Sequence, residues 1–218
     1  MDVVIAGGHG QIARRLTRLL AARGDRVRGL IRNPDHAADL EADGAEPVVV
    51  DMEAAGDLSP HVQGADAVVF AAGAGPGSGE ERKQTVDLGA AVKLADAALK
   101  TSVRRYVMIS SIGAHDPEAG PETMRPYLRA KAEADAAVLE RDLDVTIVRP
   151  GSLTDEPGTG LVDITIDLGR RGPVPRDDVA AVLVTCLDAP ETIGLTFEVF
   201  EGDREVELAV RALARSES

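Results

Sequence analysis

Two side chains able to move a proton, Tyr127 and Lys131, stand four positions apart in a stretch that Pro126 opens as a helix. Residues four apart on a helix face the same side, so the phenol and the ammonium can act on one bound molecule. The chain has only two tyrosines and four lysines, and chance would give this spacing in roughly 4% of such sequences. A nearby ammonium and the positive end of a helix both favour the phenolate, which predicts an acid–base pair.

Two serines belong to the same candidate site. Ser110 and Ser111 end the apolar run 106–111, which predicts a strand, and either hydroxyl can polarise the carbonyl group of a substrate. The Lys131 ammonium can also bond the ribose hydroxyls of a nicotinamide nucleotide and so fix the hydride-bearing ring against Tyr127. The pattern predicts proton transfer beside a hydride donor.

A glycine-rich turn near the start of the chain predicts where such a nucleotide binds. The apolar run 2–6 leads into glycines at positions 7, 8 and 10, and a helical pattern with small Ala13 in its first turn follows. Glycines allow a tight turn and let a pyrophosphate reach the helix N-terminus, where N–H groups and the helix dipole hold the anion. Both Gly8-x-Gly10-x-x-Ala13 and the looser Gly7-x-x-Gly10-x-x-Ala13 spacing can be read.

Two polar residues further along the chain bear on the choice of nucleotide. Arg32 follows the second predicted strand, 27–31, where NAD-binding chains carry a carboxylate for the ribose 2′-hydroxyl. An arginine there suits a 2′-phosphate, so the sequence favours NADP(H) over NAD(H). Asp51, beside Met52, ends a third strand, where it can accept from the adenine amino group or cap the next turn. Both readings stay open.

Strand and helix patterns alternate along the chain. Besides those named, strands are expected at 47–51, 67–72, 145–148 and 195–200, and helices at 34–43, 81–99, from 126, and at about 177–189, followed by a polar helical tail. This alternation predicts one α/β domain over residues 1–218, a doubly wound, mostly parallel sheet flanked by helices, the Rossmann fold. A substrate pocket is expected from the loops 73–80, 112–126 and 152–176.

Charge and apolar patterning narrow the class of protein. With 24 basic and 37 acidic residues the net charge is −13, which predicts that neither nucleic acid nor an anionic membrane surface is a partner. No apolar run reaches the roughly 18 residues of a membrane helix, and no charged leader precedes the first strand, so we expect a cytoplasmic protein. A homodimer stays open, because apolar helices in this fold often pair.

Cysteine and histidine give no sign of a metal site. Cys186, the only cysteine, lies in an apolar helical stretch and is expected to be a buried thiol. The four histidines show no ligand spacing on any one element, so no metal is expected. His115, in the loop before Tyr127, can touch a substrate, although exposure to solvent is the expectation for it.

The glycine turn, Ser110-Ser111, Tyr127-x-x-x-Lys131 and Arg149-Pro150-Gly151 resemble the short-chain dehydrogenase/reductase superfamily, and more narrowly its small atypical, NmrA-like NAD(P)-binding group. The resemblance implies that Ser111, Tyr127 and Lys131 are catalytic. With the residues named above it gives a cofactor site made of Gly7, Gly8, His9, Gly10, Gln11, Ile12, Arg32, Asp51, Met52, Ala72, Gly73, Lys131, Pro150 and Gly151.

The leading expectation is an NADP(H)-dependent oxidoreductase that moves hydride between nicotinamide and a small carbonyl or alcohol substrate. One alternative is an epimerase or dehydratase with a tightly held cofactor, although the short C-terminal region leaves little surface for a sugar nucleotide. The other is a non-catalytic, NADP(H)-binding redox sensor or regulator, because a fold of this kind does not by itself settle function.

Overall fold

The computed structural model describes residues 1–73, 79, 82–166 and 169–213, so the predicted loop 73–80 lies almost wholly outside the described residues. The chain begins with strand β1 (Asp2–Ala6), helix α1 (Gln11–Arg23) and strand β2 (Arg26–Ile31), which runs parallel to β1. Helix α1 ends at Gly24, whose φ of 89° places it in the left-handed region that glycine adopts without strain. This unit is the predicted strand, glycine turn, helix and second strand.

One large sheet forms the middle of the molecule. Its other strands are β3 (Glu46–Val49), β4 (Ala67–Phe70), β5 (Arg105–Ile109), β6 (Asp144–Pro150), β8 (Leu161–Thr165), β10 (Thr196–Glu201) and β11 (Arg204–Glu205). Within the described residues the order of these nine strands is β11-β8-β10-β6-β5-β4-β1-β2-β3, and only the β8 pairings with β10 and β11 are antiparallel. The predicted doubly wound, mostly parallel sheet is confirmed, and its strand order reverses between β1 and β4, where such sheets open a crevice.

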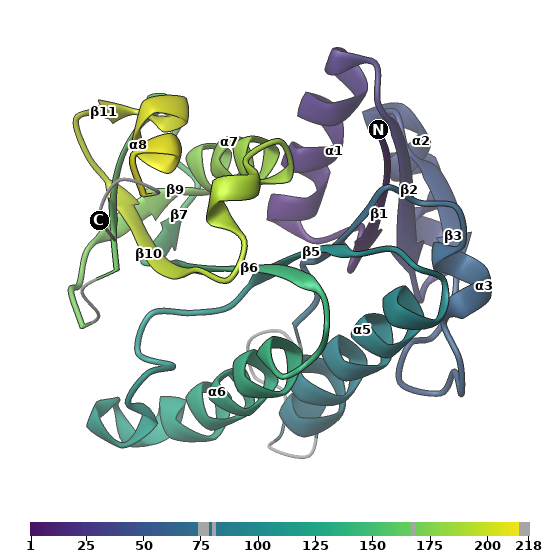
Figure 1. Ribbon diagram of the computed structural model, residues 1–218, viewed down its shortest axis with the longest axis horizontal. Helices are drawn as coiled ribbons and strands as arrows, with labels where there is room; N and C mark the ends of the chain where they lie inside the picture. The colour runs from purple at the N-terminus through teal and green to yellow at the C-terminus, as the bar shows by residue number, and fades with distance from the viewer. Residues whose placement is uncertain (74–78, 80–81, 167–168, 214–218) are drawn as a thin grey trace.

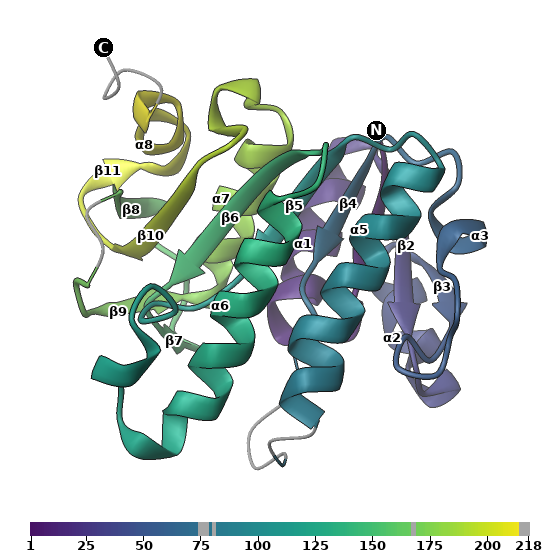
Figure 2. The same cartoon turned by 60° about the horizontal axis from the view of Figure 1, so that its bottom comes forward.

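Helices cover both faces of the sheet (Figures 1 and 2). Helices α1 and α7 (Arg176–Leu187) lie on one face, and α5 (Ala91–Lys100) and α6 (Arg125–Leu139) lie on the other. Alternate strand residues point to opposite faces, so Val3 and Ile5 pack in the core under α1 and α7. Val4 and Ala6 pack in a second core under α5 and α6.

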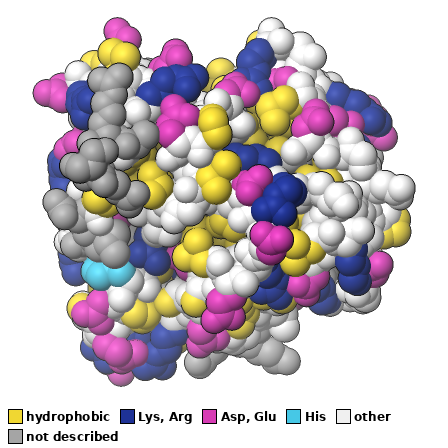
Figure 3. All heavy atoms as spheres, viewed as in Figure 1, with side chains coloured by type: hydrophobic (Ala, Val, Ile, Leu, Met, Phe, Trp, Pro, Cys, Tyr) yellow, Lys and Arg dark blue, Asp and Glu magenta, His cyan; other side chains and the backbone are white. Residues whose placement is uncertain are grey.

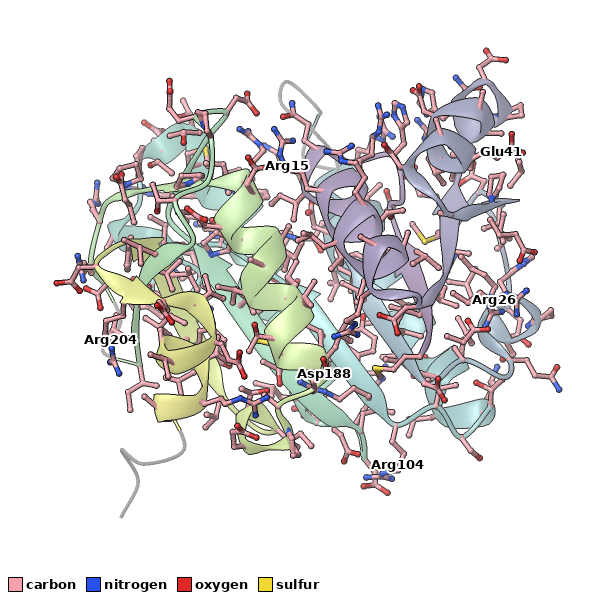
Figure 4. All side chains as sticks on the ribbon, turned by 90° about the horizontal axis from the view of Figure 1, so that it is seen from above. Arg15, Arg26, Glu41, Arg104, Asp188 and Arg204 are labelled. Atoms are coloured by element: carbon pink, nitrogen blue, oxygen red, sulfur yellow. The ribbon has the colours of Figure 1, made fainter. Side chains whose placement is uncertain are left out.

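Helices α1 and α7 lie side by side, as Figure 4 shows from above. Arg15 Nε donates to Asp177 Oδ1 at 2.6 Å near one end of the pair, and Arg23 pairs with Asp188 near the other. Arg15 and Asp188, labelled in Figure 4, mark these two ends. Helix α8 (Val206–Ala212) packs against α7 and so ties the end of the described chain to the same layer.

Short helices complete the described chain. They are η1 (Pro34–His36), α2 (Ala37–Asp43), α3 (Ser59–Val62), η3 (Pro117–Ala119), η4 (Glu122–Met124) and η5 (Pro190–Thr192). The expected helix over 34–43 is present as η1 and α2. None of the described helices has both the length and the apolar character needed to cross a membrane. Figure 3 shows acidic and basic side chains intermixed over one face of the molecule.

Two expectations about elements are wrong. The stretch 152–176, predicted as loop, holds β8, together with β7 (Ser152–Thr154) and β9 (Pro173–Pro175), which pair in parallel in a small second sheet. Strands of three residues are too short to show a pattern, and only pairing with a distant segment creates them. Within the described residues, the expected single helix over 81–99 contains a π-helix, η2 (Lys83–Ala90), which leads directly into α5.

Candidate functional site

The turn after β1 is built so that only glycine fits at its first position. Gly7 has a φ of +79°, and a Cβ there would lie 2.6 Å from the Cα of Ala72, which follows β4. The N–H of Gly10 donates to the carbonyl oxygen of Gly7 at 2.8 Å and closes the turn. The absence of a side chain at Gly7 therefore allows the chain after β1 to lie directly against the chain after β4.

The N-terminus of α1 is open at this turn. The first N–H groups of a helix have no partner within the helix. In α1 the N-cap residue, Gly10, has no side chain to accept from them, and the first turn contains no acidic residue. A Cβ at Gly8 would lie 2.9 Å from the Cα of Gly29 in β2, so this glycine serves close packing instead. The turn fits a pyrophosphate, because an anion can approach the N–H groups without a side chain in its path.

A cleft of about 320 Å³ lies over the carboxyl ends of β1, β2, β3 and β4, and we call it the cofactor cleft. It brings together eight of the predicted residues: Gly7, His9, Gly10, Arg32, Asp51, Met52, Ala72 and Gly73. Six others do not line it: Gly8, Gln11, Ile12, Lys131, Pro150 and Gly151. Ile12 is buried in the core beneath the turn, whereas Pro150 and Gly151 lie at the end of β6, two strands beyond β4 in the sheet.

Arg32 lies on the wall of the cofactor cleft, but a carboxylate that the sequence reasoning missed is bonded to it. Arg32 Nη1 is 3.1 Å from Glu53 Oε2, and Arg82 Nε is 3.6 Å from the same oxygen. Both Glu53 and Arg82 line the cleft. The cation predicted to take a 2′-phosphate is thus already paired with a carboxylate.

Asp51 acts in the structure as a cap. Its Oδ1 accepts the N–H of Glu53 at 2.9 Å and that of Ala54 at 3.5 Å. The sequence left two roles open for Asp51, a cap of the next turn and a contact with adenine, and the structure shows the cap. Asp51 also lines the cleft.

Two histidines lie against one another at the mouth of the cofactor cleft. The rings of His9 and His36 stack with centroids 3.6 Å apart, and His9 Nε2 is 2.8 Å from Asp39 Oδ2. His36 lines the cleft although the sequence gave no reason to include it. The stack holds the glycine turn against the start of α2.

Lys131 lies under the sheet end next to the cleft and is almost completely buried. Its Nζ donates to the Ile109 carbonyl oxygen at 3.1 Å and is 3.2 Å from Asp87 Oδ1. The same Nζ lies 5.9 Å from the ring centroid of Tyr127 and 5.7 Å from that of Phe70. The predicted Tyr–Lys pair is therefore adjacent in space and held at the carboxyl end of β5.

The charge state of Lys131 follows from its surroundings. Burial lowers the pKa of the Lys131 ammonium, but the negative charge of a Tyr127 phenolate and that of Asp87 raise it more. The resulting pKa is above the ordinary lysine value, so the side chain stays protonated at neutral pH. A permanent cation beside Tyr127 is what stabilisation of a phenolate requires.

Helix η2 connects this cation to the cofactor cleft. Val86 and Ala90 of η2 line the cleft, while fully buried Asp87 lies between them and contacts Lys131. A Cβ at Gly73, another cleft residue, would lie 3.3 Å from Asp87 Oδ1. The candidate acid–base residues and the cleft are thus two parts of one site.

Ser110 and Ser111 differ in their partners. Buried Ser110 donates from Oγ to Asp135 Oδ2 at 2.8 Å, and that oxygen also accepts from Arg149 Nε at 3.0 Å and Nη2 at 2.8 Å. Half-buried Ser111 donates, among the described residues, to the carbonyl oxygen of the adjacent Ile112 at 3.1 Å. Ser110 is thus committed to a buried ionic network, and Ser111 is the more accessible hydroxyl.

Asp135 and Arg149 were not predicted as site residues, although the position of Asp135 in the sequence could have indicated it. Tyr127, Lys131 and Asp135 follow one another at intervals of four on α6, so they form one stripe toward the sheet. Burial raises the pKa of Asp135, and the Arg149 charge and the Ser110 hydrogen bond lower it by less. Through Asp135 the network connects α6 to Ser110, directly after β5, and to Arg149 near the end of β6.

A further buried carboxylate lies near the predicted loop that carries His115. Glu198 of β10 is fully buried, and its Oε1 is 3.7 Å from His115 Nδ1 and accepts the Gly169 N–H at 3.3 Å. For His115 the sequence analysis left open contact with a substrate and favoured exposure to solvent; its side chain is 27% exposed and lies against this carboxylate. Gly151 packs nearby, since a Cβ there would lie 2.3 Å from the Gly172 carbonyl oxygen and 2.8 Å from the Phe200 ring.

The fold and the cofactor cleft together define a Rossmann-type dinucleotide-binding protein. The chain belongs to the NAD(P)H-binding family, whose model matches residues 7–190. It is 37% identical over 215 residues to an uncharacterized sugar epimerase of Bacillus subtilis, covering 98% of this chain and 100% of the relative.

Two solved structures are also similar. A Bacillus halodurans protein named for the NAD-dependent epimerase/dehydratases has a TM-score of 0.92 and 39% identity, with 96% of this chain and 98% of that one covered. An oxidoreductase of Lactococcus lactis has a TM-score of 0.86 and 26% identity, with coverage of 100% and 99%. These similarities confirm the resemblance to the atypical short-chain dehydrogenase/reductases and place the chain in an oxidoreductase- and epimerase-like family.

Proposed function

We propose that this protein is an NADP(H)-dependent oxidoreductase acting on a small carbonyl or alcohol substrate. The observation that carries the proposal is the buried Lys131, held by Ile109 and Asp87 beside Tyr127 and connected through η2 to the cofactor cleft. The oxidoreductase- and epimerase-like relatives support the same class of chemistry.

The residues divide the work of a carbonyl reduction. Bound NADPH supplies a hydride to the carbonyl carbon. The Ser111 hydroxyl donates a hydrogen bond to the substrate oxygen and orients it. The Tyr127 hydroxyl gives its proton to that oxygen as the alcohol forms, and solvent returns a proton to the phenolate. Lys131 stabilises the phenolate by its charge, and alcohol oxidation uses the same groups in reverse.

The test combines binding with turnover. Fluorescence titration with NADPH and, separately, NADH measures cofactor affinity, and NADPH oxidation with a panel of small aldehydes and ketones measures activity. Tyr127→Phe should leave the NADPH dissociation constant unchanged and lower kcat about a hundredfold or more, the usual contribution of a positioned acid. Turnover that survives in this variant would remove Tyr127 from the mechanism.

The second tyrosine offers a matched control. Tyr106 is fully buried in β5, and its hydroxyl donates to the Ala91 carbonyl oxygen at 3.0 Å, in the core under α5 and α6. Tyr106→Phe removes the same atom from the same residue type, and we expect it to leave kcat unchanged. A loss of activity equal to that of Tyr127→Phe would point to destabilisation of the fold.

A second candidate is an epimerase with the same trio, and the names of the Bacillus relatives favour it. An epimerase oxidises and then reduces one substrate, so its cofactor stays bound and no net NADPH is consumed. Incubation with UDP-glucose, followed by chromatographic separation of the epimers, distinguishes the two reactions. A sensor without turnover would instead bind the oxidised and reduced cofactors with different affinities and convert no substrate.

A further inference from the structure

Two arginines that line the cofactor cleft, from different elements, lie close to one carboxylate. Arg32 follows β2 and Arg82 precedes η2, so they are 50 residues apart in sequence, and Glu53 Oε2 lies 3.1 Å and 3.6 Å from them. All three side chains line the cleft. The end of β2 is where this fold holds the adenosine ribose, so the three charges surround the position that distinguishes NADP(H) from NAD(H).

Glu53 is held in place by both its backbone and its side chain. Lys93 Nζ of α5 donates to the carbonyl oxygens of Met52, Glu53 and Ala55 at 3.1, 2.7 and 2.9 Å, and Asp51 accepts the Glu53 N–H. The Thr85 hydroxyl of η2 donates to Glu53 Oε1 at 2.6 Å. The carboxylate is therefore positioned by the fold, and not only by its attraction to the arginines.

The ion pairs themselves are exchangeable. The side chains of Arg32 and Arg82 are 53% and 42% exposed, and that of Glu53 is 27% exposed. Ion pairs this exposed contribute little to stability, because solvent screens them. A phosphate monoester carries more charge than a carboxylate and binds guanidinium groups with strong, charge-assisted hydrogen bonds, so it can displace Glu53 from both arginines.

We propose that Glu53 is a built-in competitor of the cofactor 2′-phosphate for Arg32 and Arg82, and that it sets the ratio of NADP(H) to NAD(H) affinity. A 2′-phosphate must break both ion pairs and come to rest near the displaced carboxylate, which weakens its binding. A 2′-hydroxyl can instead donate a hydrogen bond to Glu53 while the ion pairs remain. The inference rests on the cofactor site of the proposed function and adds Glu53 and Arg82 as specificity residues.

The test is the dissociation constants of NADPH and NADH for the full-length protein and its variants, measured by fluorescence at constant ionic strength. Glu53→Gln should tighten NADPH binding about tenfold, which corresponds to about 1.4 kcal/mol, and leave NADH binding equal or weaker. Thr85→Val, which frees the carboxylate without removing it, should change the ratio in the same direction by less. Arg82→Gln should weaken NADPH binding and leave NADH binding nearly unchanged.

The matched control is Glu46→Gln. Glu46 is also an exposed carboxylate paired with an arginine, since its Oε2 is 2.6 Å from Arg26 Nη2, but it does not line the cleft. Glu46→Gln changes the net charge by the same amount as Glu53→Gln and should leave the dissociation constants of NADPH and NADH unchanged. An equal gain in NADPH affinity in both variants would mean a general charge effect and would overturn the proposal.

Binding and turnover outcomes separate the two proposals. An unchanged NADPH to NADH ratio in Glu53→Gln overturns the inference, whether or not the protein reduces carbonyls. A changed ratio with no turnover on any substrate supports the inference and counts against the oxidoreductase. If neither NADPH, NADH nor 2′-AMP binds the unaltered protein, both are overturned.

Discussion

At the scale of single residues, Gly7 meets two constraints that can be separated by experiment. Its φ of +79° disfavours any side chain, and a Cβ would also collide with the backbone of Ala72 at 2.6 Å. We expect Gly7→Ala to reduce NADPH affinity at least about tenfold, because the turn must move away from β4 and the N–H groups of α1 move with it. Fluorescence titration and urea unfolding measure the two effects.

Gly64 provides the control for backbone strain alone. Its φ is +76°, nearly that of Gly7, but a Cβ there would meet nothing within 4 Å. Gly64→Ala should therefore lose only the modest stability that a left-handed alanine costs, about 1 kcal/mol, with unaltered NADPH binding. Equal losses of affinity in both variants would mean that the collision with Ala72 has no part in the effect.

At the scale of elements, the join between α6 and β6 depends on a buried ion pair. Asp135 and Arg149 are both nearly inaccessible, and Asp135 Oδ2 accepts two hydrogen bonds from the guanidinium. Asp135→Asn leaves a buried arginine without its countercharge, so we expect the free energy of unfolding to fall by about 3–5 kcal/mol. Urea denaturation measures this loss.

A double replacement tests whether the unpaired charge of Arg149 causes this loss of stability. Asp135→Leu together with Arg149→Met removes both charges and keeps apolar volume, and such exchanges are often neutral for stability. The double variant should recover most of the lost stability. A double variant as unstable as Asp135→Asn would show that the Ser110 hydrogen bond, or packing, matters more than the ion pair.

The elements predicted from sequence are those whose signals are local. The glycine turn, the apolar strands predicted at 2–6 and 67–72, and the helix carrying Tyr127 and Lys131 each show their period and their boundary residues within a few positions. Their order was enough to predict a doubly wound sheet. Eight of the predicted cofactor residues lie together in the cleft because the carboxyl ends of neighbouring strands meet.

The residues and strands that were not predicted depend on contacts between segments far apart in the sequence. Asp87, which contacts Lys131, lies on the π-helix η2, and the sequence analysis expected a single uninterrupted helix there. Glu53 faces Arg32 only because β2 and β3 are neighbours in the sheet. Strands β7 and β9 exist only as partners of each other. No window of adjacent residues contains this information.

At the scale of the whole molecule, carboxylates held by arginines make stability depend on pH. Burial raises the pKa of Asp43, but its hydrogen bonds to Arg14 and Arg18 lower it more, so the net pKa is below the ordinary value. A lowered folded-state pKa gives stability that is present above the unfolded pKa, about 3.9, and is lost as pH falls through the folded value. Asp43 joins α2 to α1 in this way.

The corresponding variant is Asp43→Asn. At pH 7 we expect its free energy of unfolding to be about 1–3 kcal/mol lower than that of the unaltered protein, as for a charged hydrogen bond. The difference should shrink as the pH is lowered below 4, because the unaltered carboxyl is then also neutral. Urea unfolding at a series of pH values measures it, and a difference independent of pH would contradict the assignment.

The place of β10 in the sheet has a consequence for synthesis on the ribosome. Strand β10 covers residues 196–201 yet lies inside the sheet, between β6 and β8. Until it leaves the exit tunnel, β6 has an open edge and β8 has no antiparallel partner, so the nascent chain carries an unpaired strand edge from the emergence of β6 until that of β10. Chaperones that cover such edges should therefore engage this chain late, and premature termination before β10 should give aggregating fragments.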